Sequence, residues 1–440
     1  MAGDERIETS SPGGSSRSER EAIFTAEVER NLRRNMVANF IHGMLGMTGF
    51  RIIYAPTLIP AYLQLISGNP MIVGLGQSLL QLGLISSPLA SATALEHRAR
   101  ILPAAIRYGT LMRLSVLGLA VAGYVLAGWP LIAMSLLFLL LLGVFNGMQR
   151  VAFQMVISKL IPMNRRGRLQ GARNLMGGVV AAILSYAAGK WLIADNLWGN
   201  GYATTFLFAF ILTSMGLLAL NYGVREPDAP AVRPQTSLRE RIRDLPLLLS
   251  DLDYRWFVIA QALASAGRIA APFYILIASD HMPLNGATIG SLSLAFLGAD
   301  TLSNIVWGYL GDKRGYRSTF LASLGISLAG LFLLWVGTTP IAIIAAFAAF
   351  GIGNSGYQMS AQTMVLEFGA REDLPMRIAL TTMTEGGVSA LAPLVGGALL
   401  HWVGVGALLA SAAALTGTAL VLAVSKVRDP RQRVSPQWEE

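Results

Sequence analysis

The chain has 440 residues, of which 53% are hydrophobic and only 13% charged, and its mean hydropathy is +0.53. These values exclude an ordinary soluble domain of this length and predict an integral membrane protein. The formal net charge of +9 would suggest a nucleic-acid partner for a soluble protein, so the positions of the basic residues have to decide what the charge means.

Apolar runs long enough to cross a bilayer recur along the whole chain. A helix needs about 20 residues to span the roughly 30 Å hydrocarbon core. The sequence therefore predicts an all-α membrane protein with about twelve transmembrane helices, separated by short polar joins. In chain order the expected spans are 36–64, 71–93, 103–127, 130–158, 168–192, 202–224, 255–278, 287–308, 318–337, 340–366, 374–400 and 404–425.

Basic residues are concentrated in every second join. They precede the first span and follow the second, fourth, sixth, eighth, tenth and twelfth, whereas the other joins carry almost none apart from Lys190. By the positive-inside rule both termini are expected in the cytoplasm of a multi-pass protein of the cell (inner or cytoplasmic) membrane. The net charge thus indicates topology and a lipid bilayer as partner, and no nucleic acid.

Metal and enzyme chemistry have little support in the sequence. The chain contains no cysteine, and its four histidines are scattered without metal-ligand spacing. Hydrolase and ATP-binding motifs are also missing. We therefore expect no metal, no cofactor and no enzymatic activity.

A polar stretch divides the chain into two halves. Residues 225–254 begin with Pro227, Pro230 and Pro234, a composition typical of a linker. Ser237 followed by Glu240 fits a capping box, which predicts a short cytoplasmic helix through about residue 249. The expected organisation is a tail (1–35), a six-helix bundle (36–224), the linker (225–254), a second bundle (255–425) and a second tail (426–440).

The two halves share a sequence pattern. At one constant separation Gly147 matches Gly356, Gln149 matches Gln358, Arg168 matches Arg377, and Gly177 and Gly178 match Gly386 and Gly387. A second register relates Gly74 to Gly290, Ser87 to Ser303 and Arg98 to Arg314. Two registers covering successive elements indicate duplication, and parallel six-helix repeats are the architecture of one class of transporters.

The loop from Gly308 to Arg317 reads G-Y-L-G-D-K-R-G-Y-R and resembles the G-x-L-x-D-x-x-G-R/K signature of the major facilitator superfamily. The resemblance implies two pseudo-symmetric six-helix bundles and a monomeric secondary transporter working by alternating access. The first-half copy, Ala92 to Arg100, departs from the signature. Glu96 stands where the second half has Asp312, Arg98 matches Arg314, and Ala99 replaces Gly315.

The same loop is a candidate cytoplasmic gate. Gly308, Gly311 and Gly315 permit a short turn, and Asp312 can cap a helix or pair with a basic group. The resemblance implies that Arg314 and Arg317 clamp the bundles together through acidic groups, with Glu367 as the expected partner, and Glu96 and Arg98 in the first half. The alternative is that the basic residues only anchor the topology.

Two arginines lie where an apolar helix should cross the membrane. An arginine there costs roughly 2.5–3.5 kcal/mol, so Arg51 and Arg268 each need a reason. Each is followed by an isoleucine and then by Pro56 or Pro272 in matching places of the halves. We expect them to face each other in the cavity and to bind a carboxylate, phosphate or sulfonate, a placement similar to that in the organophosphate/phosphate antiporters of the superfamily. The alternative is structural pairing with Asp300 and Glu385.

Further polar residues in the spans complete the candidate site. They are Asn146, Gln149, Arg150 and Gln358 for the substrate, and His42, Asp300 and Glu385 for proton coupling. The sequence favours transport of a small organic anion with a proton as the candidate coupling ion. The alternatives are a multidrug or lipophile exporter of the same fold and a non-transporting membrane receptor or scaffold.

Overall fold

The computed structural model describes residues 17–95, 98–228, 250–368 and 374–428. Within these ranges every regular element is helical, and eleven helices are long and apolar enough to cross a membrane. The predicted all-α membrane fold is confirmed. The expected short helix before residue 249, and Glu96, lie outside the described residues.

The described part of the first half forms seven α-helices. In chain order they are α1 (Arg17–Tyr54), α2 (Leu58–Ser67), α3 (Pro70–Leu95), α4 (Leu102–Val125), α5 (Gly128–Leu160), α6 (Met163–Ala187) and α7 (Gly201–Gly223), with short turns η1 (Ala188–Ile193) and η2 (Leu197–Gly199) between the last two. The expected span 36–64 is divided between α1 and α2. Pro56 lies in the break, where its missing N–H and rigid ring disfavour a continuous helix.

The second half repeats this plan. Its elements are α10 (Leu252–Gly267), η3 (Arg268–Phe273), α11 (Tyr274–Ala278), α12 (Gly286–Arg314), α13 (Tyr316–Val336), α14 (Pro340–Met364), η4 (Val365–Glu367), α15 (Leu374–Trp402) and α16 (Val405–Ser425). Its first span is also broken, because a 3-10 turn containing Pro272 separates α10 from α11. Both halves therefore begin with a discontinuous crossing.

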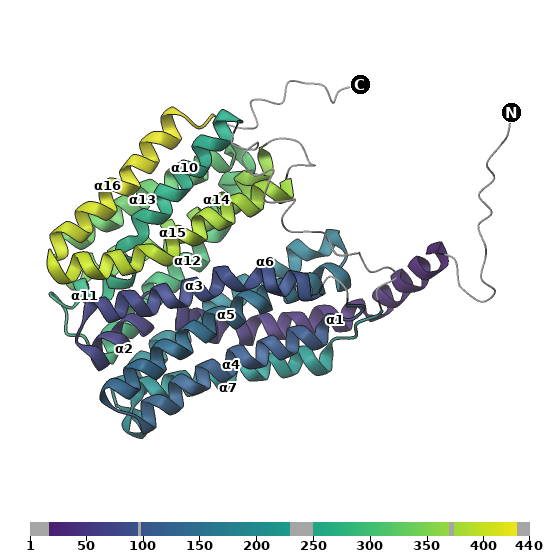
Figure 1. Ribbon diagram of the computed structural model, residues 1–440, viewed down its shortest axis with the longest axis horizontal. Helices are drawn as coiled ribbons and strands as arrows, with labels where there is room; N and C mark the ends of the chain where they lie inside the picture. Colours follow the sequence, from purple (N-terminus) through teal and green to yellow (C-terminus); the bar gives the residue numbers. More distant parts are fainter. Residues whose placement is uncertain (1–16, 96–97, 229–249, 369–373, 429–440) are drawn as a thin grey trace.

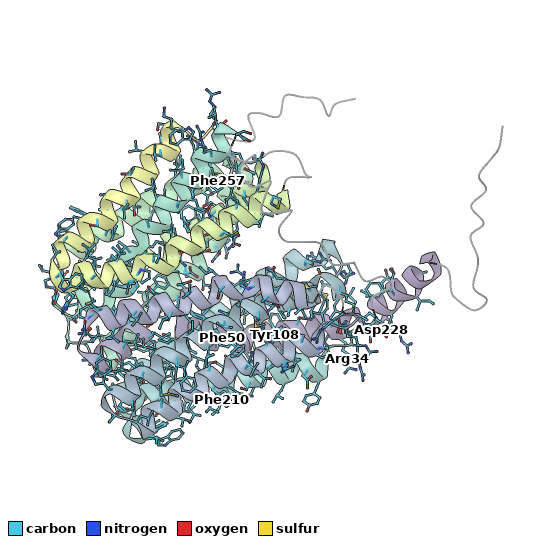
Figure 2. The ribbon with its side chains drawn as sticks, viewed as in Figure 1. Arg34, Phe50, Tyr108, Phe210, Asp228 and Phe257 are labelled. Atoms are coloured by element: carbon cyan, nitrogen blue, oxygen red, sulfur yellow. The ribbon has the colours of Figure 1, made fainter. Side chains whose placement is uncertain are left out.

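The two bundles meet at one end and diverge toward the other (Figure 1). The buried apolar cluster near α2 and α11 contains residues of both halves, such as Ile59 and Ile275. At the other end each half has a separate cluster, one around Leu160 and one around Phe257. We call this second end the basic end, since it carries Arg34, Lys159, Arg314 and Lys426; Figure 2 shows Arg34 and Asp228 there.

Backbone contacts between glycines join the bundles at the opposite end. Gly74 of α3 lies against Pro393 and Gly397 of α15, and Gly189 lies against Gly286 and Gly290 of α12. A side chain at Gly74 or Gly189 would overlap backbone atoms of the other half, so only glycine permits this approach. We call these contacts the glycine seam. A hydrogen bond of 2.6 Å between the hydroxyls of Thr57 and Ser293 accompanies it.

Candidate substrate site and the basic end

Arg51 and Arg268 occupy matching places at the two helix breaks. Arg51 is in the last turn of α1, and its carbonyl accepts a 3.0 Å hydrogen bond from the Ala55 N–H just after the helix ends. Arg268 follows the end of α10 and begins the 3-10 turn η3. Discontinuous helices of membrane transporters expose backbone and polar groups where substrates and ions bind. The geometry thus places both cations where the helix geometry changes.

Arg51 reaches across from the first half to the second. Its Nη1 donates a 3.0 Å hydrogen bond to Oγ1 of Thr301 and lies 3.6 Å from Oδ2 of Asp300, both on α12. The Arg51 and Asp300 side chains are only 20% and 14% exposed. Gly178 of α6 lies against both Thr301 and Arg51, and a side chain there would overlap them. Three helices thus fix the guanidinium beside the carboxylate.

Arg268 joins the same carboxylate through one intermediate residue. Asn354 of α14 donates 2.8 Å from Nδ2 to Oδ1 of Asp300, and its Oδ1 accepts a 2.7 Å bond from Nη2 of Arg268. The Arg268 guanidinium also lies over the ring of Tyr357, 5.4 Å from its centroid. We call Arg51, Thr301, Asp300, Asn354 and Arg268 the arginine network. It brings the two arginines to one carboxylate, rather than placing them face to face.

Glu385 lies beside Tyr357 next to this network, and within the described ranges it forms no ion pair with Arg51 or Arg268. One of its oxygens, Oε2, accepts a 3.0 Å hydrogen bond from Nε2 of Gln261 on α10. Of the structural pairs considered from the sequence, the structure contains the one between Arg51 and Asp300. Glu385 is bonded to a neutral amide and Asp300 lies beside a guanidinium, so the two carboxylates have different surroundings.

In the part of the chain that the structure describes, the other predicted substrate residues have their side-chain contacts with groups outside the arginine network. Asn146 donates 2.8 Å to the hydroxyl of Tyr54, and Gln149 is buried against Gly109 of α4. Arg150, next to it on α5, is exposed. Gln358 accepts a long 3.4 Å bond from Gln362 one turn later. Asn146, Gln149 and Arg150 were expected in one site because they are neighbours on α5. Their side chains point in different directions around that helix.

His42 belongs to a separate cluster inside the first bundle. Its ring lies 5.0 Å from that of Phe153, over which the Arg173 guanidinium is placed at 4.7 Å. Arg113, only 2% exposed, donates 2.8 Å to the Thr213 carbonyl and 2.7 Å to the Gly109 carbonyl. Arg113 is therefore buried inside the first bundle with its donors bonded to backbone carbonyls. His42 lies outside the arginine network.

Sequence reasoning missed Thr301, Asn354 and Tyr357. Asn354 carried a usable signal, because an amide in the middle of the apolar run 340–366 requires hydrogen-bond partners. Thr301 and Tyr357 carried none, since both residue types are common in membrane helices and Thr can bond to its own helix.

The loop after α12 is organised within the second half. Gly315 has φ of 83°, which ends α12, and the Tyr316 hydroxyl donates 3.2 Å to Oδ1 of Asp312. Gly311 packs against the Tyr316 ring, whereas the Cβ position of Gly308 faces open space. Arg314 is exposed. These contacts explain two glycines of the signature locally, by the turn and by the close ring.

Arg317 differs from its expected role as a clamp for acidic groups. Its Nε donates 2.7 Å to the carbonyl of Val427, and its Nη2 donates 2.9 Å to that of Val424. Basic side chains commonly satisfy the last carbonyls of a helix in this way. Arg317 thus caps α16 inside its own bundle. Glu367 lies in η4, and Arg98 is exposed in the first-half loop.

A buried carboxylate ties together the basic end of the first half. Glu226, which follows α7, accepts 2.8 Å bonds from the backbone N–H groups of Ile101 and Leu102 at the start of α4. Its Oε1 also lies 2.9 Å from Nζ of Lys159 at the end of α5, and the two side chains are only 3% and 8% exposed. Carboxylates stabilise helix N-termini through the unpaired N–H groups and the helix dipole.

Replacing Glu226 with Ala is expected to destabilise the protein by about 3–5 kcal/mol, since it leaves the buried Lys159 ammonium without its counter-ion and two backbone N–H groups without their acceptor. The melting temperature in detergent measures this change. The control is Asp228→Asn. Asp228 pairs with Arg100 at 2.7 Å, but their side chains are 65% and 62% exposed.

Arg100 holds the pKa of Asp228 below its ordinary value, chiefly through their hydrogen bond. Solvent screens such an exposed pair, so Asp228→Asn should leave the melting temperature nearly unchanged. Equal losses in the two variants would contradict the assigned role of Glu226.

The fold is that of a secondary transporter. Such proteins have two helical bundles within the membrane, and here each bundle begins with a broken helix and the two enclose a charged network. Comparison with known proteins points to the same class. A family model described as Major Facilitator Superfamily matches residues 257–440.

Curated relatives resemble part of the chain. The MFS-type transporter pgmG of Aspergillus terreus is 24% identical over 150 residues, which are 33% of this chain and 26% of that protein. The match thus spans about a quarter of the length of the relative.

Solved structures resemble nearly the whole chain. They include the nucleoside transporter NupG (TM-score 0.63, 12% identity, 89% of this chain and 97% of that one) and a D-xylose-proton symporter (0.66, 14%, 91% and 99%). A POT family transporter in complex with a thioalcohol conjugated peptide is a third (0.64, 12%, 89% and 95%). At these identities the likeness concerns the fold. Together the findings support a major facilitator superfamily transporter of the secondary kind.

Proposed function

We propose that the protein moves a small organic anion across the membrane by alternating access, coupled to a proton. The arginine network carries this proposal. It contains two guanidinium groups contributed by different halves, at matching helix breaks, around the single carboxylate of Asp300. Guanidinium groups bind carboxylate, phosphate and sulfonate with paired hydrogen bonds, which suits an anionic substrate.

Charge balance suggests how binding would involve a proton. A substrate anion that takes the Arg51 guanidinium replaces Asp300 as its partner. An ionised carboxylate left without its counter-ion in a low-dielectric site is unfavourable, so Asp300 is expected to take up a proton when the substrate binds. Return of Asp300 to Arg51 would release both the proton and the substrate.

Motion between the bundles would act on the same contact. Arg51 belongs to the first half and Asp300 to the second, so a rocking of one bundle against the other changes their separation. Substrate and proton would thus be exchanged as the bundles move. This is the property that a coupled transporter needs.

The proposal is tested first by a thermal-shift screen of anionic, neutral and cationic compounds, followed by uptake of the stabilising compounds into proteoliposomes. We expect small organic anions to stabilise the protein and to accumulate when a pH gradient is imposed. Stabilisation by lipophilic cations or neutral lipophiles alone would instead indicate a multidrug or lipophile exporter. Stabilisation by a ligand without any flux would indicate a receptor or scaffold.

A further inference from the structure

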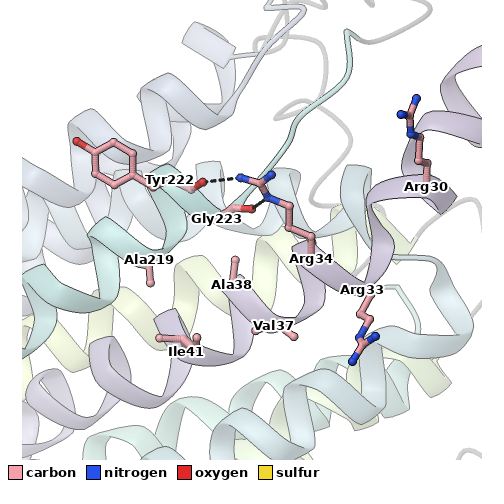
Figure 3. Close-up of a pocket in the computed structure, with 9 residues that line it drawn as sticks. All are labelled: Arg30, Arg33, Arg34, Val37, Ala38, Ile41, Ala219, Tyr222 and Gly223. Atoms are coloured by element: carbon pink, nitrogen blue, oxygen red, sulfur yellow. Dashed lines mark hydrogen bonds between the residues drawn. The ribbon is translucent and has the colours of Figure 1, made fainter.

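A depression lies between α1 and α7 at the basic end (Figure 3). Its volume is about 670 Å³. Arginines line one part, and mostly small or apolar residues line the rest. The lining residues are Arg30, Arg33, Arg34, Val37, Ala38, Ile41, Ala219, Tyr222 and Gly223.

The three arginines have different tasks. Arg34 donates 2.8 Å from Nε to the Gly223 carbonyl and 2.9 Å from Nη2 to the Tyr222 carbonyl, so it caps the end of α7. Figure 3 shows Arg34 turned toward these carbonyls and Arg30 and Arg33 turned away from them. Among the described residues neither Arg30 nor Arg33 makes a hydrogen bond or ion pair, and both are exposed. Two positive charges therefore remain available.

The apolar part of the depression continues along the same face of α1. Residues at three- and four-residue spacing lie on one side of α1. They are Arg30, then Arg33 or Arg34, then Val37 and Ile41. At 1.5 Å per residue, Arg30 and Ile41 are roughly 16 Å apart along the axis. This length fits a headgroup followed by the first part of an acyl chain.

Apolar side chains on this face are exposed. Val37 of α1 is 52% exposed, and Tyr222, near the end of the membrane-crossing helix α7, is 73% exposed. Tyrosine is enriched at the level of lipid headgroups, where its ring is apolar and its hydroxyl polar. The basic and apolar parts are thus ordered as the polar and apolar parts of a lipid are.

We infer that this depression binds an anionic glycerophospholipid. Its phosphate contacts Arg30 and Arg33, and an acyl chain packs over Val37, Ile41 and Ala219. Basic pockets between membrane helices bind anionic headgroups, and each basic residue near the surface contributes to attraction. A neighbouring depression is lined by Glu29, Arg33 and Arg165, so its charged side chains also have a net positive charge.

The test uses the full chain in detergent, with phosphatidylglycerol or phosphatidylcholine added and bound lipid counted by native mass spectrometry. We expect phosphatidylglycerol to be retained in preference to phosphatidylcholine. The double variant Arg30→Gln/Arg33→Gln should weaken phosphatidylglycerol binding about 30-fold, at roughly tenfold or less for each charge. Val37→Ser should weaken it too, while leaving the charges in place.

The matched control is Lys426→Gln/Arg428→Gln, which removes two exposed positive charges at the end of α16. This variant should bind phosphatidylglycerol like the wild type. Equal weakening by both double variants, or equal binding of phosphatidylcholine, would overturn the inference. The inference would also be overturned if glycerol 3-phosphate displaced the lipid and bound as tightly as phosphatidylglycerol does. That result would show a site for soluble phosphate compounds.

Discussion

Asp300→Asn is expected to abolish pH-driven accumulation of substrate while leaving exchange of substrate across the membrane. Asparagine has the size of aspartate and still offers Oδ1 to the Asn354 amide, but it carries no charge for Arg51 and cannot release a proton. Accumulation under an imposed pH gradient should fall at least about tenfold, whereas exchange at equal pH should persist. Both are measured in proteoliposomes.

Glu385→Gln is the matched control. Its amide oxygen can still accept from Gln261, and Glu385 makes no ion pair with Arg51 or Arg268 among the described residues. We expect coupling to survive in this variant. If Glu385→Gln uncouples transport and Asp300→Asn does not, the proton-binding group is Glu385 and the proposed exchange of partners at Arg51 is wrong.

Arg51→Gln and Arg268→Gln should each weaken binding of the anionic substrate about 10- to 100-fold. A hydrogen bond to a charged group contributes about 1.5–3 kcal/mol, and 1.4 kcal/mol corresponds to a factor of ten. Arg51→Lys should recover part of the loss, because lysine restores the charge but not the paired donors. Substrate-induced thermal shifts and uptake as a function of substrate concentration measure the effect.

The control for this prediction is Arg150→Gln, which removes an exposed positive charge outside the arginine network. The affinity of this variant for the substrate should stay within about threefold of that of the wild type, since water and salt screen an exposed charge. A larger loss in Arg150→Gln than in Arg51→Gln would place the anion on α5 and contradict the proposed site.

The membrane fold could be predicted because it follows from composition and periodicity. The spans and the two halves follow from runs of apolar residues, whose length is set by the bilayer. The resemblance in the loop from Gly308 to Arg317 is confirmed by the family model over the second half and by the solved structures. The expected first span was wrong in being continuous. A proline inside an apolar run does not by itself predict a break, since Pro88 and Pro393 lie inside the unbroken helices α3 and α15.

The site was only partly predictable. Arg51, Arg268 and Asp300 were identified because each charge is costly inside a membrane helix. Which charge meets which depends on packing between distant helices. Gly178, for example, fixes Arg51 against Thr301 by its lack of a side chain. Nothing in the spacing of Asn146, Gln149 and Arg150 indicated that Gln149 packs toward α4.

The glycine seam has a kinetic consequence. Its contacts at Gly74 and Gly189 are between uncharged backbone atoms, and the hydrogen bond between the hydroxyls of Thr57 and Ser293 beside it is also neutral. Separating such surfaces exposes no charge, so that end of the molecule can open at little electrostatic cost. The charged step is the separation of Arg51 from Asp300. Under the proposed function, an anionic substrate that replaces Asp300 beside Arg51 would lower the barrier to opening, whereas the empty protein would have to separate the two charges without a substitute.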